Sequence, residues 1–368
     1  MPASKIQQKP PRRDPGWTGF RWLAPGTSAR DRRLAAGPGS SVIRLLRRGF
    51  RYGFVIAPEQ ILEQSPSFAD PGAPTHLPGI LNERLETHRA DVRRTLGLLE
   101  EIRRGATLAP HIHRRLQIQR RFQAAGTSVD LGEPREIEKV HADALTSQCR
   151  RRLVGDLYAK LSWVSTDRRD PSLRIRFSFG SERLRDWMKN PRRAVWADRY
   201  AQAVFPECAV LAENRPLLRW LRRRIGGGFR LSERIVYSNA PGGGAVFHHD
   251  AEPHQVGVIY GQLAGETLWL ALPKRRLAQI LAPKLGREPT QILHDLDGHG
   301  DRRLERALNE SPQLVGELVA GGWCYRLRAG DAIHLPSPTE HDVAWHSVFG
   351  IGNTPSLALS FAIFPKSA

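Results

Sequence analysis

Residues 234–273 read RIVYSNAPGGGAVFHHDAEPHQVGVIYGQLAGETLWLALP, and this stretch decides the predicted fold. Residues 234–237 predict a strand, which a glycine-rich turn at 239–244 follows. Residues 256–263 and 268–272 are short apolar runs separated by a glycine, so they predict two buried strands. Many short strands joined by Gly/Pro turns are typical of a β-sandwich or a β-barrel.

The regions on both sides of this stretch extend the same pattern. Residues 173–179 alternate apolar and polar side chains and predict a strand with one buried face. Three further strands are predicted at 323–327, 332–335 and 357–363. Residues 275–320 instead show apolar side chains at helical spacing, so we expect a helical insertion between strands. The predicted fold class is therefore α+β.

The first half of the chain is less informative. Residues 1–40 are rich in Pro, Gly, Ser and Arg, so we expect a disordered basic tail. Residues 41–165 are expected to form a mainly helical N-terminal region, with helical segments at 81–125 and 136–161. The strand-rich domain is then predicted to cover residues 166–368.

The sequence Phe247-His248-His249-Asp250 contains a His-x-Asp pair. Because side chains alternate faces along a strand, His248 and Asp250 point the same way and His249 points the opposite way. Two imidazoles and one carboxylate form the ligand set of non-haem Fe(II) oxygenases, so a third, distant ligand is needed. On position alone, His341 and His346 are both candidates.

The charge of the chain is strongly basic and unevenly placed, with a net charge of +19. Residues 1–51 carry 12 basic against 2 acidic side chains, and residues 151–230 carry 19 against 8. Residues 231–368 carry 12 against 14. An acidic partner or a nucleic acid could therefore bind through segments 1–51 and 151–230.

Three further features of the sequence indicate the cellular location of the protein. The sequence has no run of 18 apolar residues, so we expect no membrane span. Residues 1–13 are polar, so we expect no secretory signal. Cys149, Cys208 and Cys324 show no CxxC spacing, which argues against a disulfide framework and favours a cytoplasmic location.

A set of motifs follows in fixed order along the last third of the chain, at residues 244–250, 262–270, 330–336, 345–348 and 357–361. Together they resemble the Jumonji-C and cupin-like 2-oxoglutarate-dependent oxygenases. The resemblance covers about residues 231–368. It implies a double-stranded β-helix (cupin or jelly-roll) core and an Fe(II)- and 2-oxoglutarate-dependent hydroxylase activity.

The same resemblance implies the metal ligands. His248 and Asp250 match the first two, and the Trp-His-x-Val form around His346 matches the third. His341 fits the usual distance from the Gly330-Asp331 turn better and stays the alternative. The metal would be Fe(II) and the co-substrate 2-oxoglutarate.

The chain departs from the family pattern where the second carboxylate of 2-oxoglutarate would bind. A lysine is expected at position 267, where this chain has a threonine, and no arginine follows Arg328. The candidates for the co-substrate are Tyr237 or Tyr260, Thr267, Lys274 and Ser360, together with Arg326 or Arg328.

Two other functions remain open at this point. A cupin can hold a metal without using 2-oxoglutarate, which the missing lysine would favour. The chain could also be a catalytically inactive protein that binds nucleic acid or a ribosome through its basic segments.

Overall fold

The computed structural model describes residues 20–23, 41–44, 53–56, 71–128, 135–145, 153–165, 169–180, 190–298, 300–339 and 341–366. Most of the predicted tail at 1–40 lies outside the described residues. Three short strands of the N-terminal part form a sheet of their own, in the order β1-β3-β2. Their bounds are β1 (Phe20–Leu23), β2 (Ser41–Arg44) and β3 (Gly53–Ile56).

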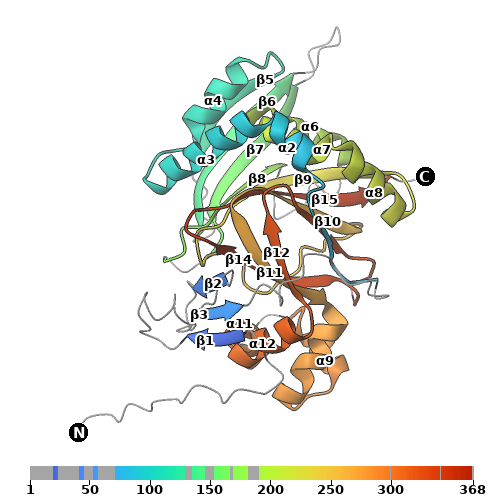
Figure 1. The fold of residues 1–368 in the computed structure, drawn as a ribbon. Helices are drawn as coiled ribbons and strands as arrows, with labels where there is room; N and C mark the ends of the chain where they lie inside the picture. The colour runs from blue at the N-terminus through green and yellow to red at the C-terminus, as the bar shows by residue number, and fades with distance from the viewer. Residues whose placement is uncertain are drawn as a thin grey trace.

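A nine-stranded sheet and a three-stranded sheet form the centre of the molecule (Figure 1). The large sheet has the order β4-β13-β10-β15-β9-β8-β7-β6-β5, and the small one has the order β12-β11-β14. All strand pairings in both sheets are antiparallel. The large sheet consists of β4 (Thr75–Leu77), β5 (Phe122–Ser128), β6 (Glu136–Leu145), β7 (Leu153–Trp163), β8 (Leu173–Phe179), β9 (Phe229–Ser238), β10 (Gly257–Ala264), β13 (Ala332–Pro336) and β15 (Leu357–Pro365). The small sheet consists of β11 (Glu266–Pro273), β12 (Cys324–Arg328) and β14 (Ala344–Ile351).

The last third of the chain winds back and forth between the two sheets. From β9 the chain passes to the segment at His248, which bridges to His346 of β14 beside the small sheet. It returns to the large sheet at β10, enters the small sheet at β11 and β12, and then places β13, β14 and β15 alternately in the two sheets. This winding is that of a double-stranded β-helix, so the predicted α+β fold with a jelly-roll core is confirmed.

The strands of the core are buried on both faces. In β10, Val258 and Tyr260 belong to the cluster of side chains between the two sheets. Ile259 and Leu263 project the other way, into the core under the helices. Strands covered on both faces show nearly continuous apolar sequence, which is why 257–273 contains so few charged residues.

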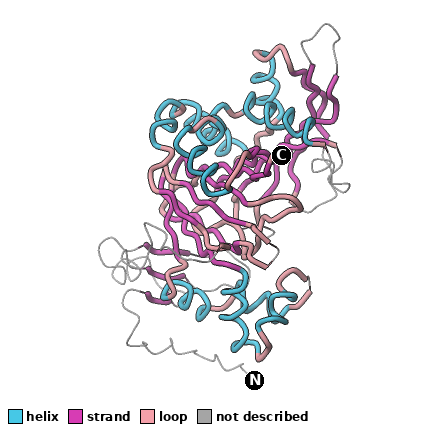
Figure 2. The backbone as a smooth tube through the Cα atoms, turned by 90° about the vertical axis from the view of Figure 1, so that its right-hand side faces the viewer, coloured by secondary structure: helices cyan, strands magenta, loops and turns pink. Residues whose placement is uncertain are grey.

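Helices cover the outer face of the large sheet (Figure 2). Their side chains pack on the outward residues of the strands, for example Phe177 of β8 against Tyr200, with ring centroids 5.2 Å apart. Within the described residues they are α2 (Asn82–Thr87), α3 (Arg89–Arg103), α4 (Ala109–Gln117), α6 (Pro191–Val204), the short 3-10 helix η3 (Pro206–Cys208), α7 (Ala209–Ala212) and α8 (Arg215–Ile225).

Four helices occupy the interval in which the sequence predicts a helical insertion. They pack on the outward side chains of β11, among them Leu268 and Leu270. Asp301 and Ser311 accept hydrogen bonds from the first turns of two of them, which fixes where those helices begin. The four are α9 (Lys274–Leu285), α10 (Pro289–Asp295), α11 (Arg302–Asn309) and α12 (Pro312–Ala320).

The predicted helix over 136–161 is wrong, because this segment forms β6 and β7. In β6 the buried residues alternate, with Val140, Ala142 and Ala144 at 0–1% exposure under the helices. The N-terminal region is thus helical only as far as α4. Its later strands extend the sheet of the barrel, and the division of the chain into domains stays a prediction. None of the helices in the described residues has the length and apolar character needed to cross a membrane.

Candidate metal centre

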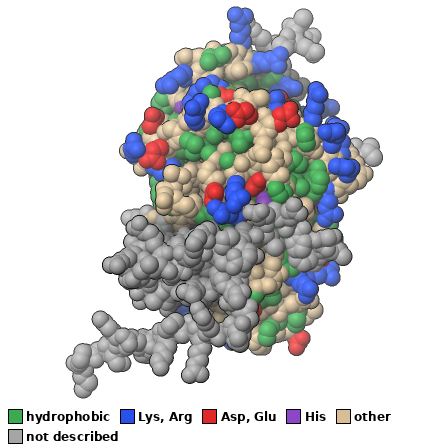
Figure 3. All heavy atoms as spheres, viewed as in Figure 1, with side chains coloured by type: hydrophobic (Ala, Val, Ile, Leu, Met, Phe, Trp, Pro, Cys, Tyr) green, Lys and Arg blue, Asp and Glu red, His purple; other side chains and the backbone are tan. Residues whose placement is uncertain are grey.

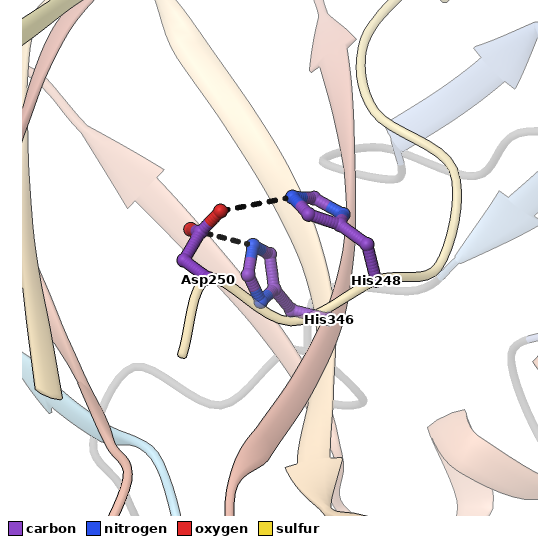
Figure 4. Close-up of side chains that lie close together, drawn as sticks. All are labelled: His248, Asp250 and His346. Atoms are coloured by element: carbon purple, nitrogen blue, oxygen red, sulfur yellow. Dashed lines mark ion pairs between the residues drawn. The ribbon is translucent and has the colours of Figure 1, made fainter. Parts of the chain in front are cut away.

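Two distant segments meet at the edge of the small sheet. The backbone of His248 exchanges two hydrogen bonds with that of His346 on β14, with N–O distances of 3.0 and 2.9 Å. This pairing places the two imidazoles side by side, with ring centroids 4.3 Å apart. Asp250 follows two residues later and turns its carboxylate toward both rings (Figure 4).

The three side chains are close enough to share one ion. His248 Nε2 lies 3.4 Å from Asp250 Oδ1, and His346 Nε2 lies 3.5 Å from Asp250 Oδ2. One ligand atom from each of the three lies within 4.8 Å of the others. Metal bonds of about 2.1 Å at right angles separate neighbouring ligand atoms by roughly 3 Å, so the donor set fits a first-row transition metal.

The ring of His248 is held in the tautomer that a metal requires. Its Nδ1 lies 2.7 Å from the carbonyl oxygen of Val246. Because a carbonyl only accepts, Nδ1 carries the proton, and Nε2 turns an unprotonated lone pair toward Asp250 and His346. Trp269 stacks on the ring of His346 at 5.2 Å and 27°.

The electrostatics keep the set in its metal-binding protonation state. Burial, aided by the neighbouring His248, lowers the pKa of His346 to about 3. Burial raises the pKa of Asp250, but the two neighbouring imidazoles, His248 above all, lower that pKa more strongly, to below its usual range. At neutral pH the site therefore offers a neutral imidazole on β14 and an ionised carboxylate. The side chain of Asp250 is 33% exposed.

The other histidines predicted near the site lie elsewhere. His249 points to the opposite side, as strand alternation predicts, and contacts Trp345 at 5.4 Å between ring centroids and Asp297 at 3.6 Å. His341 is exposed on the turn before β14 and is not part of the cluster. Of the two candidates for the third ligand, the structure brings His346 to His248 and Asp250.

A narrow cavity of about 30 Å³ adjoins the three side chains. Tyr237, Tyr260 and Ser360, three of the predicted co-substrate residues, line the cavity. The full lining is Val164, Tyr237, Asn239, Ala245, His248, Asp250, Val258, Tyr260, Trp269, Leu335, His346, Val348 and Ser360.

Two other residues predicted to bind the co-substrate do not line this cavity. Thr267 is fully buried beside it, where its hydroxyl donates to Gln262 and accepts from the indole of Trp269. Lys274 is also fully buried, but its ammonium group bonds to Asp297 in the helical insertion, at 2.5 Å. The sequence could not exclude Lys274, because the acid that binds it is 23 residues away.

Arg326 and Arg328 lie on β12 and also point away from the cavity. They alternate with Tyr325 and Leu327, whose side chains fill the space between the sheets. Arg326 pairs with Glu266 at 2.5 Å instead. These two arginines are therefore placed on the outside of the small sheet.

Sequence reasoning missed Asn239 and Trp269 as cavity residues. Trp269 lies two positions after Thr267 on the same strand, so alternation alone places both on one face. Asn239 follows the end of β9, in the turn for which no strand pattern applies. His334 of β13 is 2% exposed, because α8 covers that face of the strand and sets Trp220 against its ring at 5.4 Å.

No protein-family model matches the sequence, and no curated protein matches it. Several solved structures of 2-oxoglutarate-Fe(II) oxygenases are similar to this chain at low identity. An oxygenase of this family from Burkholderia pseudomallei is 10% identical over 44% of this chain and 57% of its own, with a TM-score of 0.24. The ribosomal oxygenase YcfD from Escherichia coli is 12% identical over 65% and 42%, with a TM-score of 0.25. The carbocyclase SnoK from nogalamycin biosynthesis is 10% identical over 80% of both chains, with a TM-score of 0.31. The chain thus spans less than two thirds of the first two of these proteins.

Proposed function

We propose that the chain is an Fe(II)- and 2-oxoglutarate-dependent oxygenase, a hydroxylase whose substrate is unknown. The observation that carries this proposal is the convergence of His248, Asp250 and His346 beside a cavity between the two sheets of a double-stranded β-helix. Two imidazoles and one carboxylate bind Fe(II) on one face and leave positions open for other ligands.

Each part of the site has a task in this reaction. Bound Fe(II), together with 2-oxoglutarate and oxygen, supplies the oxidising chemistry that hydroxylates a C–H bond. The Val246 carbonyl orients the ring of His248, and Trp269 holds that of His346. Apolar side chains such as Val258 and Leu335 line the adjoining cavity and limit the access of water.

An anaerobic titration tests this function without knowledge of the substrate. Adding Fe(II) and then 2-oxoglutarate to the wild-type protein should produce the weak visible charge-transfer band of the chelate. Asp250→Ala should not produce the band, because the carboxylate ligand is lost. A wild-type protein that binds Fe(II) but gives no band with 2-oxoglutarate would contradict the proposal.

A metal-binding cupin that does not use 2-oxoglutarate is the second candidate. It is favoured by the lining of the cavity, which contains no lysine or arginine among the described residues. The same titration separates the two functions, because such a protein would bind metal without forming the chelate.

We also propose that the chain binds an acidic partner, with RNA as the polyanion to test first. This proposal is supported by α8, which carries five arginines and no acidic residue in its 11 positions. Figure 3 shows Lys and Arg side chains along the edge of the upper body where Figure 1 places α8. Binding of this kind is compatible with an active or an inactive metal centre.

A further inference from the structure

The cavity beside the metal ligands needs a cation if a dicarboxylate is to bind there. A carboxylate removed from water is stabilised mainly by a charge-assisted hydrogen bond, usually from arginine or lysine. The lining offers hydroxyl groups from Tyr237, Tyr260 and Ser360 but no positive charge among the described residues. A cation for such a ligand must therefore lie just behind these side chains.

The strand register places one arginine at that position. Arg174 of β8 lies directly opposite Tyr237 of β9 and Ser162 of β7. Residues opposite each other in antiparallel strands project from the same face, with Cβ atoms about 4.5–5.5 Å apart. Val164 follows Ser162 by two residues and lines the cavity, as Tyr237 does. Arg174 thus projects from the face that forms the cavity wall, between strands that contribute to its lining.

The charge of Arg174 is not balanced by a carboxylate of the described residues. Its Nε donates a hydrogen bond to the hydroxyl of Ser162 at 2.9 Å. The next two cations on the same face are both paired, Arg176 with Glu233 at 2.6 Å and Lys160 with Glu136.

The guanidinium of Arg174 has electrostatic contact with the cavity. Burial and the charge of Asp250 raise the pKa of Tyr237, and the charges of Arg174 and Arg176 oppose that rise. A half-buried guanidinium without a counter-ion is unfavourable, and its planar donors match a carboxylate well. These properties suit an anion held beside the hydroxyl of Tyr237.

We propose that Arg174 is the counter-ion for the second carboxylate of the co-substrate, the carboxylate that does not reach the metal. This inference rests on the proposed function and adds a specificity-determining residue to it. It also accounts for the threonine at position 267, because the cation comes from β8 instead of β11. Arg174 then selects a dicarboxylate over a monocarboxylate of the same length.

The test measures binding to the full-length protein loaded with Mn(II), so that no turnover occurs. Isothermal titration calorimetry would compare 2-oxoglutarate with 2-oxopentanoate, which has the same chain length but lacks the second carboxylate. The wild-type protein should bind 2-oxoglutarate at least about tenfold more tightly, as expected for one charge-assisted contact. Arg174→Gln should lose this preference while its affinity for 2-oxopentanoate stays unchanged, and Arg174→Lys should restore part of it.

Arg326→Gln is the matched control, because Arg326 carries the same charge on the outer side of β12. It should keep the preference. If Arg174→Gln keeps the preference too, the role of Arg174 is refuted while the proposed function stands. If the Mn(II)-loaded wild-type protein binds neither keto acid, both the inference and the proposed function fail. Unchanged affinity of Arg174→Gln for 2-oxopentanoate also shows that the variant is folded.

Discussion

Burial keeps several histidines of the described residues in the neutral form. Burial lowers the pKa of His346 and His334 to about 3 and that of His111 to about 4. For His346 a neutral ring is what a metal ligand requires. His334 has no such task, since it packs against Trp220 on the outer face of β13. Its neutral state is a consequence of packing.

The buried ring of His334 predicts a pH-dependent stability. Its pKa lies below that of the unfolded chain, so on acidification the unfolded state takes up a proton first. Stability should therefore fall as the pH drops below about 6.5 toward 3. Between pH 7 and pH 5, His334→Gln should lose about 2 kcal/mol less stability than the wild-type protein. Urea denaturation of both proteins at the two pH values measures this, and equal losses would contradict it.

At the level of single residues, the sequence predicts those positions that follow from strand alternation. His248 and Asp250 share one side, and His249 points away, as the structure shows. Alternation could not choose between His341 and His346, because the length of the turn before β14 is free to vary. It also could not foresee that Asp297 would bind Lys274, since that contact depends on how the helical insertion folds back.

The segment that carries His248 and Asp250 depends on a close approach between two backbones. Gly244 has a φ of +139°. A Cβ at this position would lie 2.3 Å from the carbonyl oxygen of Val348 on β14. Only glycine lets the segment pass so close to β14, which in turn allows His248 and His346 to pair.

Gly244→Ala should therefore weaken metal binding without changing a ligand. Moving the segment away from β14 separates His248 from His346, and we expect the affinity for Mn(II) to fall about tenfold or more, with a stability loss of roughly 1–3 kcal/mol. Gly97→Ala on α3 is the control, because its added Cβ meets nothing within 4 Å. Calorimetric titration with Mn(II) measures the effect, and equal affinities of the two variants would refute this role of Gly244.

Among the elements, buried apolar strands and the insertion were predictable, whereas the edge of the large sheet was not. The sequences of β10 and β11 are nearly continuous apolar runs, as expected for strands that are buried on both faces. In β6 and β7 the buried positions hold several alanines between charged residues. Alanine and charged residues also favour helices, so the sequence pattern did not distinguish these strands from a helix.

At the scale of the molecule, α8 carries a dense group of basic side chains in the described part of the chain. Arg215, Arg219, Arg222 and Arg223 on α8 are exposed, and none pairs with an acidic side chain of the described residues. The segment 231–368, with the metal ligands, has slightly more acidic than basic residues. A polyanion held along α8 would therefore contact a surface separate from the metal ligands.

Replacing those four arginines of α8 by glutamine should weaken binding to single-stranded oligouridylate. The slope of log Kd against log salt concentration should shrink by about 0.7 for each phosphate that the variant no longer neutralises. Fluorescence anisotropy at several salt concentrations measures the slope. A variant with Arg276, Arg302, Arg303 and Arg306 of the insertion changed to glutamine is the control. If both variants keep the wild-type slope, α8 is not the binding surface.

The metal content of purified variants tests the central claim most directly. Full-length protein would be loaded anaerobically with Fe(II), freed of excess metal and analysed by inductively coupled plasma mass spectrometry. The three-ligand site predicts about one iron per wild-type chain and per His341→Ala chain, and little iron in His248→Ala, Asp250→Ala and His346→Ala. Full iron content in the Asp250→Ala and His346→Ala proteins would contradict the account.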